Sequence, residues 1–221
     1  MNTEIFKRVI SSIILIPLCL FFILKGSFFF VSFLLVLFLL SIYEWYFLAK
    51  KRKYLVPGFL LISLSFILAY FLRKNGLTEF MIIILICIFT DIGGYTFGKL
   101  FKGPKLTKIS PNKTYSGLIG SLITSLLAFI CLINYSRWNS EQFEINLNFF
   151  ELSYSIQDFT LVILISLVSQ SGDIIISYFK RLAKVKNTGN LIPGHGGILD
   201  RIDGMIFVFP SVFIIYFILN L

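Results

Sequence analysis

The chain has 221 residues, of which 57% are hydrophobic and only 14% are charged, and its mean hydropathy is +0.88. A soluble domain carries about 25% charged residues, so this composition excludes an ordinary soluble globular protein. The formal net charge of +9 does not by itself indicate nucleic-acid binding, because basic loops beside anionic lipid headgroups account for it.

Several apolar segments are long enough to cross a bilayer, which takes roughly 20 apolar residues in a helix. Each is apolar nearly all round, unlike the amphipathic pattern of a soluble helix. We therefore predict an all-α, polytopic integral membrane protein that forms a single domain over residues 1–221, with about seven transmembrane helices. In chain order these cover residues 6–24, 27–48, 55–72, 79–98, 115–134, 159–179 and 203–221.

The distribution of basic residues predicts the orientation of the chain. Lys7 and Arg8 precede the first apolar segment, as in a signal peptide, but no small-residue cleavage site follows, so we expect this helix to be retained. With the N-terminus in the cytoplasm, most of the 20 basic residues lie in cytoplasmic segments. This asymmetry follows the positive-inside rule and predicts an outer C-terminus. The outer segments then hold only Lys25, Arg73, Lys74 and Arg137.

Apart from Glu79 and Asp203 at the span ends, three carboxylates lie inside the predicted spans, where an ionisable group is costly unless it faces protein or water. Glu44 lies near the cytoplasmic end of its span beside Trp45, which fits either an interfacial anchor or a functional group. Asp91 is followed by a small-residue face at Gly94 and Gly98, which helix packing explains without explaining Asp91. The third, Asp173, is the most informative.

Asp173 belongs to a polar stripe in which residues recur at spacings of three and four, so they share one side of a helix. A stripe that runs from a buried carboxylate to two lysines predicts a polar cavity open to the cytoplasm. The stripe comprises Ser166, Ser169, Gln170, Asp173, Ser177, Lys180 and Lys184.

Two cytoplasmic loops add cations and backbone donors. In the first, Ser110, Lys113 and Thr114 precede an apolar segment, and a capped helix N-terminus is a ready anion site. The second contains the glycines Gly194, Gly196 and Gly197, which allow N–H groups to turn toward one anion. His195, the one histidine of the chain, fits a turn residue or a phosphate contact or proton donor, and it cannot form a zinc site alone.

This set of residues predicts phosphoryl or nucleotidyl transfer at a membrane surface. Aspartates suit Mg²⁺, which takes oxygen ligands and often bridges to substrate phosphates. Lysine and arginine neutralise phosphate charge, and such reactions depend on positioning and charge neutralisation more than on covalent catalysis.

Longer blocks of sequence resemble a known family. Near the C-terminus the chain reads Ser177-x-x-Lys180-Arg181 and then Pro193-Gly194-His195-Gly196-Gly197-x-x-Asp200-Arg201-x-Asp203. Further blocks are Gly172-Asp173, Ser110-Pro111-Asn112-Lys113-Thr114-x-x-Gly117, Asp91-x-Gly93-Gly94-Tyr95-x-x-Gly98, and Arg8…Ile16-Pro17 with Glu44-Trp45. Together these closely resemble the phosphatidate cytidylyltransferases (CDP-diacylglycerol synthases).

The resemblance implies that CTP and phosphatidic acid react to give CDP-diacylglycerol and pyrophosphate. It implies a Mg²⁺ site on Asp173 and Asp200, with a second cation left open, and a homodimer. The expected partners are CTP, phosphatidic acid and membrane lipids, with no nucleic acid. The predicted catalytic residues are Asp173, Lys180, Arg181, His195, Asp200, Arg201 and Asp203. The predicted substrate-binding residues are Asp91, Ser110, Lys113, Thr114, Ser177, Gly194, Gly196 and Gly197.

The chain departs from the family pattern at two positions, with Asn187 where Asp is usual and Gly204 where Ser is frequent, and it is short for the family. A related lipid-phosphate transferase, a lipid kinase, a transporter and a membrane scaffold are the alternatives. A transporter usually shows inverted repeats, which are not evident here. High Lys, Asn and Ile usage suggests a bacterial inner membrane.

Overall fold

The computed structural model describes residues 3–49, 52–143, 155–192, 194 and 196–219. Within these residues the fold is all-α, as predicted, and extended pairing is limited to isolated bridges between Lys105 and Thr114 and between Ile192 and Gly196. The helices are α1 (Thr3–Lys25), α2 (Ser27–Leu48), α3 (Arg52–Asn75), α4 (Leu77–Phe101), α5 (Tyr115–Phe143), α6 (Ile156–Leu182), α7 (Leu199–Ile202) and α8 (Met205–Leu219).

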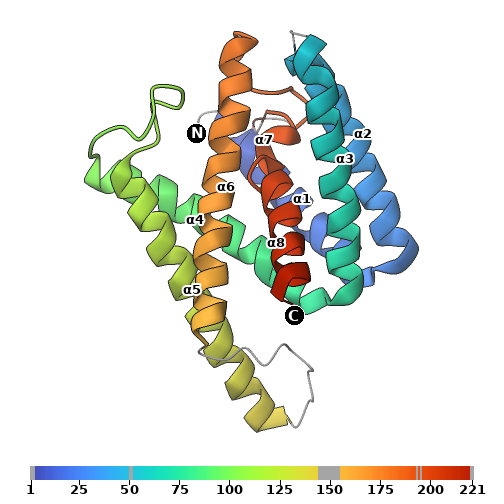
Figure 1. Cartoon of the computed structure of the whole chain (residues 1–221), viewed down its shortest axis with the longest axis vertical. Coiled ribbons are helices and arrows are strands. Elements are labelled where there is room, and N and C mark those ends of the chain that lie inside the picture. Colours follow the sequence, from blue (N-terminus) through green and yellow to red (C-terminus); the bar gives the residue numbers. More distant parts are fainter. Residues whose placement is uncertain (1–2, 50–51, 144–154, 193, 195, 220–221) are drawn as a thin grey trace.

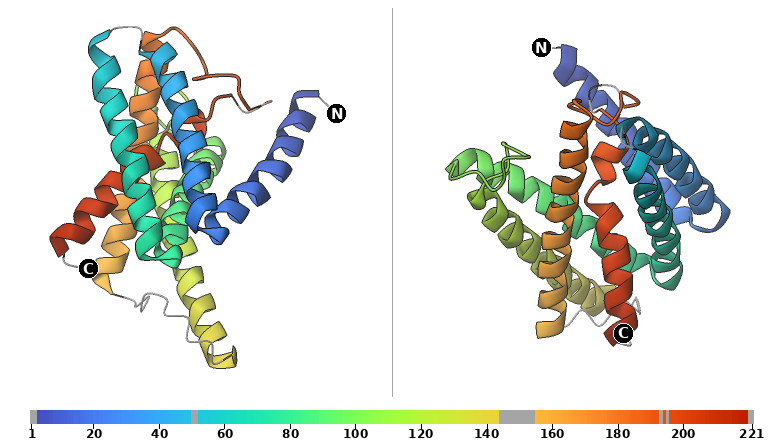
Figure 2. Two further views of the ribbon diagram at one scale, coloured as in Figure 1. Left: turned by 90° about the vertical axis from the view of Figure 1, so that its right-hand side faces the viewer. Right: turned by 45° about the horizontal axis from the view of Figure 1, so that its top comes forward.

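Helices α6 and α8 lie in the middle of the bundle, with α2 and α3 on one side and α4 and α5 on the other (Figure 1). Helix α4 crosses obliquely and contacts α6. Helix α1 meets the bundle at its C-terminal end and leans away from it toward the N-terminus (Figure 2). The segment that follows α6 and the loop between α4 and α5 both lie at the end of the bundle away from the C-terminus. We call this end the polar end.

Five helices of the described chain are long and apolar enough to cross a membrane, which confirms a polytopic membrane protein. They are α2 to α6, and two shorter apolar helices, Ile10–Lys25 and Met205–Ile218, correspond to the first and last predicted spans. The total of seven spans therefore stays a prediction. The span predicted at 115–134 agrees with the apolar part of α5, Tyr115–Tyr135, although the helix itself continues to Phe143. Residues 199–202 form the separate short helix α7, which was not predicted.

A proline inside α8 links that helix to α3. Pro210 has no N–H, so it cannot donate to the carbonyl of Ile206 four residues earlier. The hydroxyl of Ser65 on α3 donates to this carbonyl instead. Because an unsatisfied carbonyl is costly away from water, this bond holds α8 against α3.

Two glycines bring α6 against the start of α8. A Cβ atom at Gly172 would lie 2.6 Å from Phe207 Cδ2 and 2.9 Å from the carbonyl oxygen of Asp203, and one at Gly204 would lie 2.4 Å from Ser169 Oγ. A side chain at either position would force the helices apart. At Gly204, where the resemblance leads us to expect serine, the closeness of Ser169 leaves little room for a side chain.

We expect Gly172→Ala to destabilise the protein, because overpacking costs about 1–3 kcal/mol. Gly94→Ala is the matched control, because it is also a helical glycine but its nearest contacts would lie at 3.9 Å. This control should be neutral or gain up to about 1 kcal/mol from helix propensity. Thermal unfolding in detergent measures both, and equal midpoints would contradict the close contact of α6 with α8.

Candidate active site at the polar end

Three aspartates from separate elements meet at the polar end. Asp173 on α6 is hydrogen-bonded to Asp203, which lies between α7 and α8. Asp91 on α4 interacts electrostatically with both. Burial raises the pKa of Asp203 well above its usual range, and the charges of Asp173 and Asp91 raise it further. A protonated Asp203 can therefore donate to Asp173, which relieves the repulsion between adjacent carboxylates.

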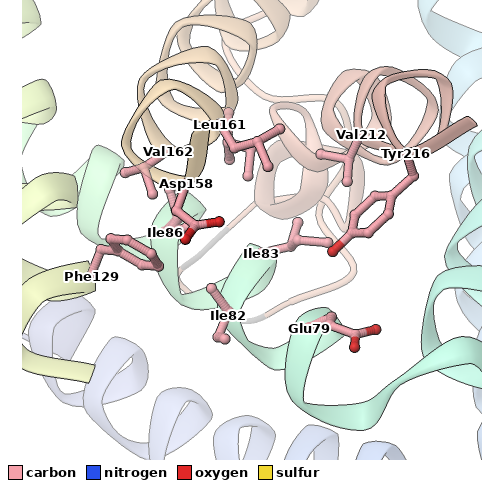
Figure 3. Close-up of a pocket in the computed structure, with 11 residues that line it drawn as sticks. Glu79, Ile82, Ile83, Ile86, Phe129, Asp158, Leu161, Val162, Val212 and Tyr216 are labelled. Atoms are coloured by element: carbon pink, nitrogen blue, oxygen red, sulfur yellow. The ribbon is translucent and has the colours of Figure 1, made fainter. Parts of the chain in front are cut away.

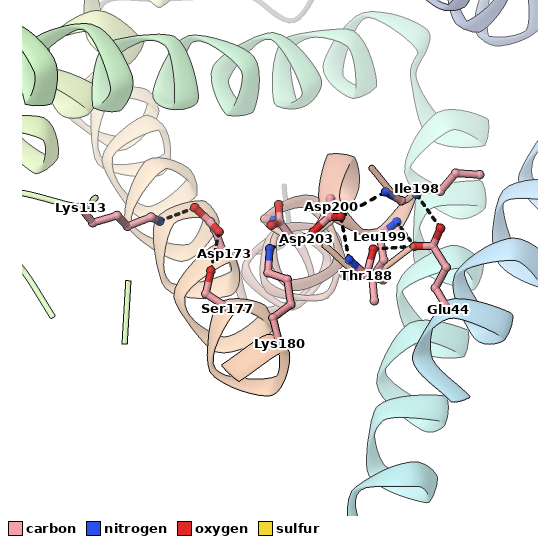
Figure 4. A network of polar contacts seen from close by, with 12 residues as sticks. Glu44, Lys113, Asp173, Ser177, Lys180, Thr188, Ile198, Leu199, Asp200 and Asp203 are labelled. Carbon is pink, nitrogen blue, oxygen red and sulfur yellow. Dashed lines mark hydrogen bonds and ion pairs between the residues drawn. The ribbon is translucent and has the colours of Figure 1, made fainter. Parts of the chain in front are cut away.

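Two lysines neutralise this acidic cluster (Figure 4). Lys113, from the loop before α5, places Nζ 2.6 Å from Asp173 Oδ2 and donates to the carbonyl of Gln170 at 3.1 Å. Lys180, near the end of α6, donates to Asp200 Oδ1 at 2.8 Å and interacts electrostatically with Asp173 and Asp203. The lysines thus connect the loop before α5 and the segment after α6 to one cluster.

Asp200 organises the segment that follows α6. Its Oδ2 accepts from the backbone N–H groups of Thr188 at 2.8 Å and Gly197 at 3.1 Å, in addition to the bond that Oδ1 accepts from Lys180. Asn187, where the family usually has Asp, borders Gly196 on the side where Asp200 also lies. A second carboxylate there would add negative charge beside Asp200.

Glu44 lies in the same network, and of its two interpretations, an interfacial anchor or a functional group, its burial fits the second better. Glu44 is only 1% exposed. Its carboxylate accepts from Thr188 Oγ1 at 2.7 Å and from the N–H groups of Ile198 and Leu199 at 2.9 Å each. An acidic residue inside a predicted span marks Glu44 as a candidate, but the sequence does not show which distant groups donate hydrogen bonds to it.

The other predicted residues take different places. Ser177 donates to Asp173 Oδ1 at 3.2 Å, and Thr114 caps α5 by accepting from Gly117 N–H at 3.1 Å. The carbonyl of Ser110 accepts from Lys113 N–H, so Ser110 shapes the turn that presents this lysine. Exposed Arg181 lies in the last turn of α6, and exposed Arg201 interacts electrostatically with Asp91.

Some backbone N–H groups of the glycine loop, which were predicted to bind an anion, already donate to acceptors within the protein. Gly194 and Gly196 have positive φ angles of 76° and 90°, which favour glycine. The N–H of Gly196 donates to Ile192, and that of Gly197 donates to Asp200. An acidic side chain thus occupies part of the predicted anion site. His195 lies outside the described residues, so its predicted role stays a prediction.

A different pocket lies at the opposite end of the bundle (Figure 3). It encloses about 440 Å³, counting space open to the surroundings, and is lined by Glu79, Asp158, Tyr216 and apolar side chains. No predicted site residue lines it. The polar end, not this pocket, therefore holds the groups that suit phosphate chemistry.

A model of the cytidylyltransferase family matches residues 69–219, which include the aspartate cluster and its two lysines. The chain belongs to the cytidylyltransferase family. Members of this family are nucleotidyltransferases, so the predicted enzyme class is confirmed. The matched region also contains the loop before α5, although Glu44 lies outside it.

Relatives named phosphatidate cytidylyltransferase match most of the chain. The protein of Rickettsia felis is 34% identical over 218 residues, covering 96% of this chain and 92% of the relative. That of Rickettsia typhi is 37% identical over 218 residues, covering 95% and 91%. That of Staphylococcus haemolyticus is 39% identical over 150 residues, covering 67% of this chain and 53% of the relative. The chain is therefore short beside the staphylococcal relative but similar in extent to the rickettsial ones.

We expect Lys180→Gln to lower cytidylyltransferase activity roughly 10- to 100-fold, because a hydrogen bond to a charged group contributes about 1.5–3 kcal/mol. The control is Lys184→Gln, which removes an exposed lysine of the same segment. Initial rates of the purified proteins measure the effect. Equal rates for the two variants would contradict a role for the Lys180–Asp200 ion pair.

Proposed function

We propose that the protein transfers CMP from CTP to phosphatidic acid, giving CDP-diacylglycerol and pyrophosphate for phospholipid biosynthesis. One observation carries this proposal: Asp173, Asp200 and Asp203 lie together with Lys113 and Lys180 at one end of a bundle of membrane helices. The relatives named phosphatidate cytidylyltransferase support the choice of both substrates.

The aspartates suit a Mg²⁺ ion, which takes oxygen ligands and is usually held by one or two carboxylates together with substrate phosphates. Among the described residues, no three acidic, His or Cys side chains converge on one metal position, so water and substrate phosphates would supply the remaining ligands. A carboxylate has about four lone-pair sites. Asp173 accepts from Lys113, Ser177 and Asp203, and Asp200 accepts from Lys180 and two N–H groups, so each has room for one more partner.

We therefore propose Asp173 and Asp200 as the residues that hold Mg²⁺, and the identity of a second cation stays open. When bound, the ion neutralises phosphate charge and makes the α-phosphorus of CTP more electrophilic. The residues present fit this role because hard oxygen donors and flexible lysines share one site. The lysines that pair with the aspartates in this structure are long enough to exchange a carboxylate for a phosphate.

The residues of the chain bind and orient the two phosphates. A phosphate oxygen of phosphatidic acid attacks the α-phosphorus of CTP, and a P–O bond forms as the bond to the β-phosphate bridge breaks. The electron pair leaves with pyrophosphate. Lys113 and Lys180 neutralise the charge that collects on these oxygens, and Arg181 and Arg201 extend the cationic surface. The hydrogen bond from Ser177 keeps Asp173 oriented toward the site.

We also propose that the polar end faces the cytoplasm of a bacterium, with the N-terminus on the same side and the protein in the inner membrane. The positive-inside distribution supports this orientation. The bacterial origin of the relatives supports the compartment. In this orientation, the loop before α5 and the segment after α6 face the compartment that supplies CTP. A homodimer stays a prediction.

The test is incorporation of labelled CTP into lipid by the purified protein with phosphatidic acid and Mg²⁺. We expect Asp173→Asn and Asp200→Asn to reduce product formation roughly 100-fold or more, because an electrostatic partner of the transition state is lost. Removing Mg²⁺ with a chelator should have a similar effect on the wild type.

Asp158→Asn is the matched control, because Asp158 lies on the same helix as Asp173 but lines the pocket at the other end. It should retain wild-type activity. A folded wild-type protein that forms no CDP-lipid with any divalent ion would overturn the proposed activity. Full activity in both variants would overturn the metal assignment alone.

A further inference from the structure

Glu44 is the one buried carboxylate of the network that belongs neither to the aspartate cluster nor to the matched family region. It lies on α2, 144 residues before Thr188 and 155 residues before Leu199, to both of which it is hydrogen-bonded. The entropy of loop closure rises only slowly with loop length, so the separation itself does not explain this contact. Its role follows from the groups that Glu44 holds in place.

Thr188 connects Glu44 to the active site. Its hydroxyl donates to Glu44 Oε2 at 2.7 Å, while its backbone N–H donates to Asp200 Oδ2 at 2.8 Å. One residue thus joins the carboxylate on α2 to the carboxylate proposed to hold Mg²⁺. A shift of Thr188 moves a donor of Asp200 directly.

The second connection runs through the start of α7. Glu44 accepts from the N–H groups of Ile198 and Leu199, the two residues immediately before Asp200. Leu199 is fully buried, with 0% exposure. Glu44 thereby fixes the backbone that carries Asp200 as well as the residue that donates to it. Figure 4 shows Glu44 opposite Thr188, Ile198 and Leu199, with Asp200 on the far side of this segment.

Two glycines make the approach of Glu44 possible. A Cβ atom at Gly189 would lie 2.7 Å from Glu44 Oε1, and one at Gly197 would lie 2.3 Å from Glu44 Oε2. Side chains at these positions would displace the carboxylate. The glycine at 197 therefore serves the contact with Glu44 in addition to donating its N–H to Asp200.

We propose that Glu44 is a positioning residue for cytidylyl transfer, which holds Asp200 in place through Thr188 and the start of α7. This inference rests on the proposed function. We assign Glu44 a positioning role because its carboxylate is buried and accepts from three protein donors, on Thr188, Ile198 and Leu199. Its effect is predicted to reach the substrates only through the carboxylate of Asp200.

The test uses two pairs of variants in the full-length protein. Glu44→Gln keeps the shape but replaces one acceptor with a donor. Thr188→Val removes the hydroxyl at nearly constant volume, and Thr188→Ser restores it. Ser41→Ala is the control for α2, because buried Ser41 lies one turn from Glu44 and its hydroxyl donates within α2, to the carbonyl of Leu37.

We expect Glu44→Gln and Thr188→Val to raise the Mg²⁺ concentration for half-maximal activity roughly 10- to 100-fold, the usual effect of removing an outer-shell partner of a metal ligand. The KM for phosphatidic acid should stay near the wild-type value. Thr188→Ser should recover most of the loss, and Ser41→Ala should behave as wild type. The double variant of Glu44→Gln with Thr188→Val should lose less than the product of the two single losses, because both remove the same contact.

A second measurement does not depend on enzyme activity. Hydrogen–deuterium exchange of the peptide that contains residues 198 and 199, without CTP and Mg²⁺, should be at least about 10-fold faster in Glu44→Gln. These two N–H groups donate to different oxygens of Glu44, and the variant replaces one of those oxygens with a donor. Exchange in α4 and α5 should not change. This pattern separates a local loss of positioning from general unfolding.

Several outcomes would overturn the proposal. The first is a wild-type Mg²⁺ dependence in both Glu44→Gln and Thr188→Val. The second is a lower melting temperature together with equal changes in the Mg²⁺ dependence and in the KM for phosphatidic acid. If the wild type is active and the variants are unaffected, only the positioning role is contradicted. If the wild type is inactive, the proposed function and this inference are both contradicted, while the exchange data still report whether Glu44 holds the segment after α6.

Discussion

A carboxylate can be buried in a membrane protein only where donors surround it, and this constraint organises the polar end of the bundle. Asp173, Asp200 and Glu44 each accept hydrogen bonds from elements that are far apart in the chain. To satisfy these carboxylates, the loop before α5 and the segment after α6 have to lie against the helices. The same groups that stabilise the fold therefore build the candidate active site.

Small residues determine which of these groups meet. Gly172 and Gly204 let α6 approach the start of α8, and this approach places Asp173 beside Asp203. Gly197 lets the segment after α6 close over Glu44. A larger side chain at any of the three positions would separate acidic groups from their donors, so packing and chemistry are constrained together. The departure at Gly204 from the family pattern belongs to this packing and need not alter the chemistry.

Much of the fold was predictable because a bilayer imposes a simple rule on sequence: spanning helices are long and apolar. The segments predicted at 27–48 and 159–179 lie within α2 and α6. The extension of α5 beyond its apolar span was not predictable from hydropathy, since most of the residues that continue the helix to Phe143 are polar. The short helix α7 was also missed, because four residues give no periodic signal.

The sequence by itself determined the membrane class, the family, and the aspartates and lysines that lie in the polar end, because these follow from composition and from residues close together in the chain. Only the tertiary structure decided the partners of those residues. Lys113 pairs with Asp173, Lys180 with Asp200, and Glu44 with a segment 144 or more residues away. Such pairings depend on how helices cross and on which glycines allow close approach, and hydropathy and spacing along one helix carry no information about either.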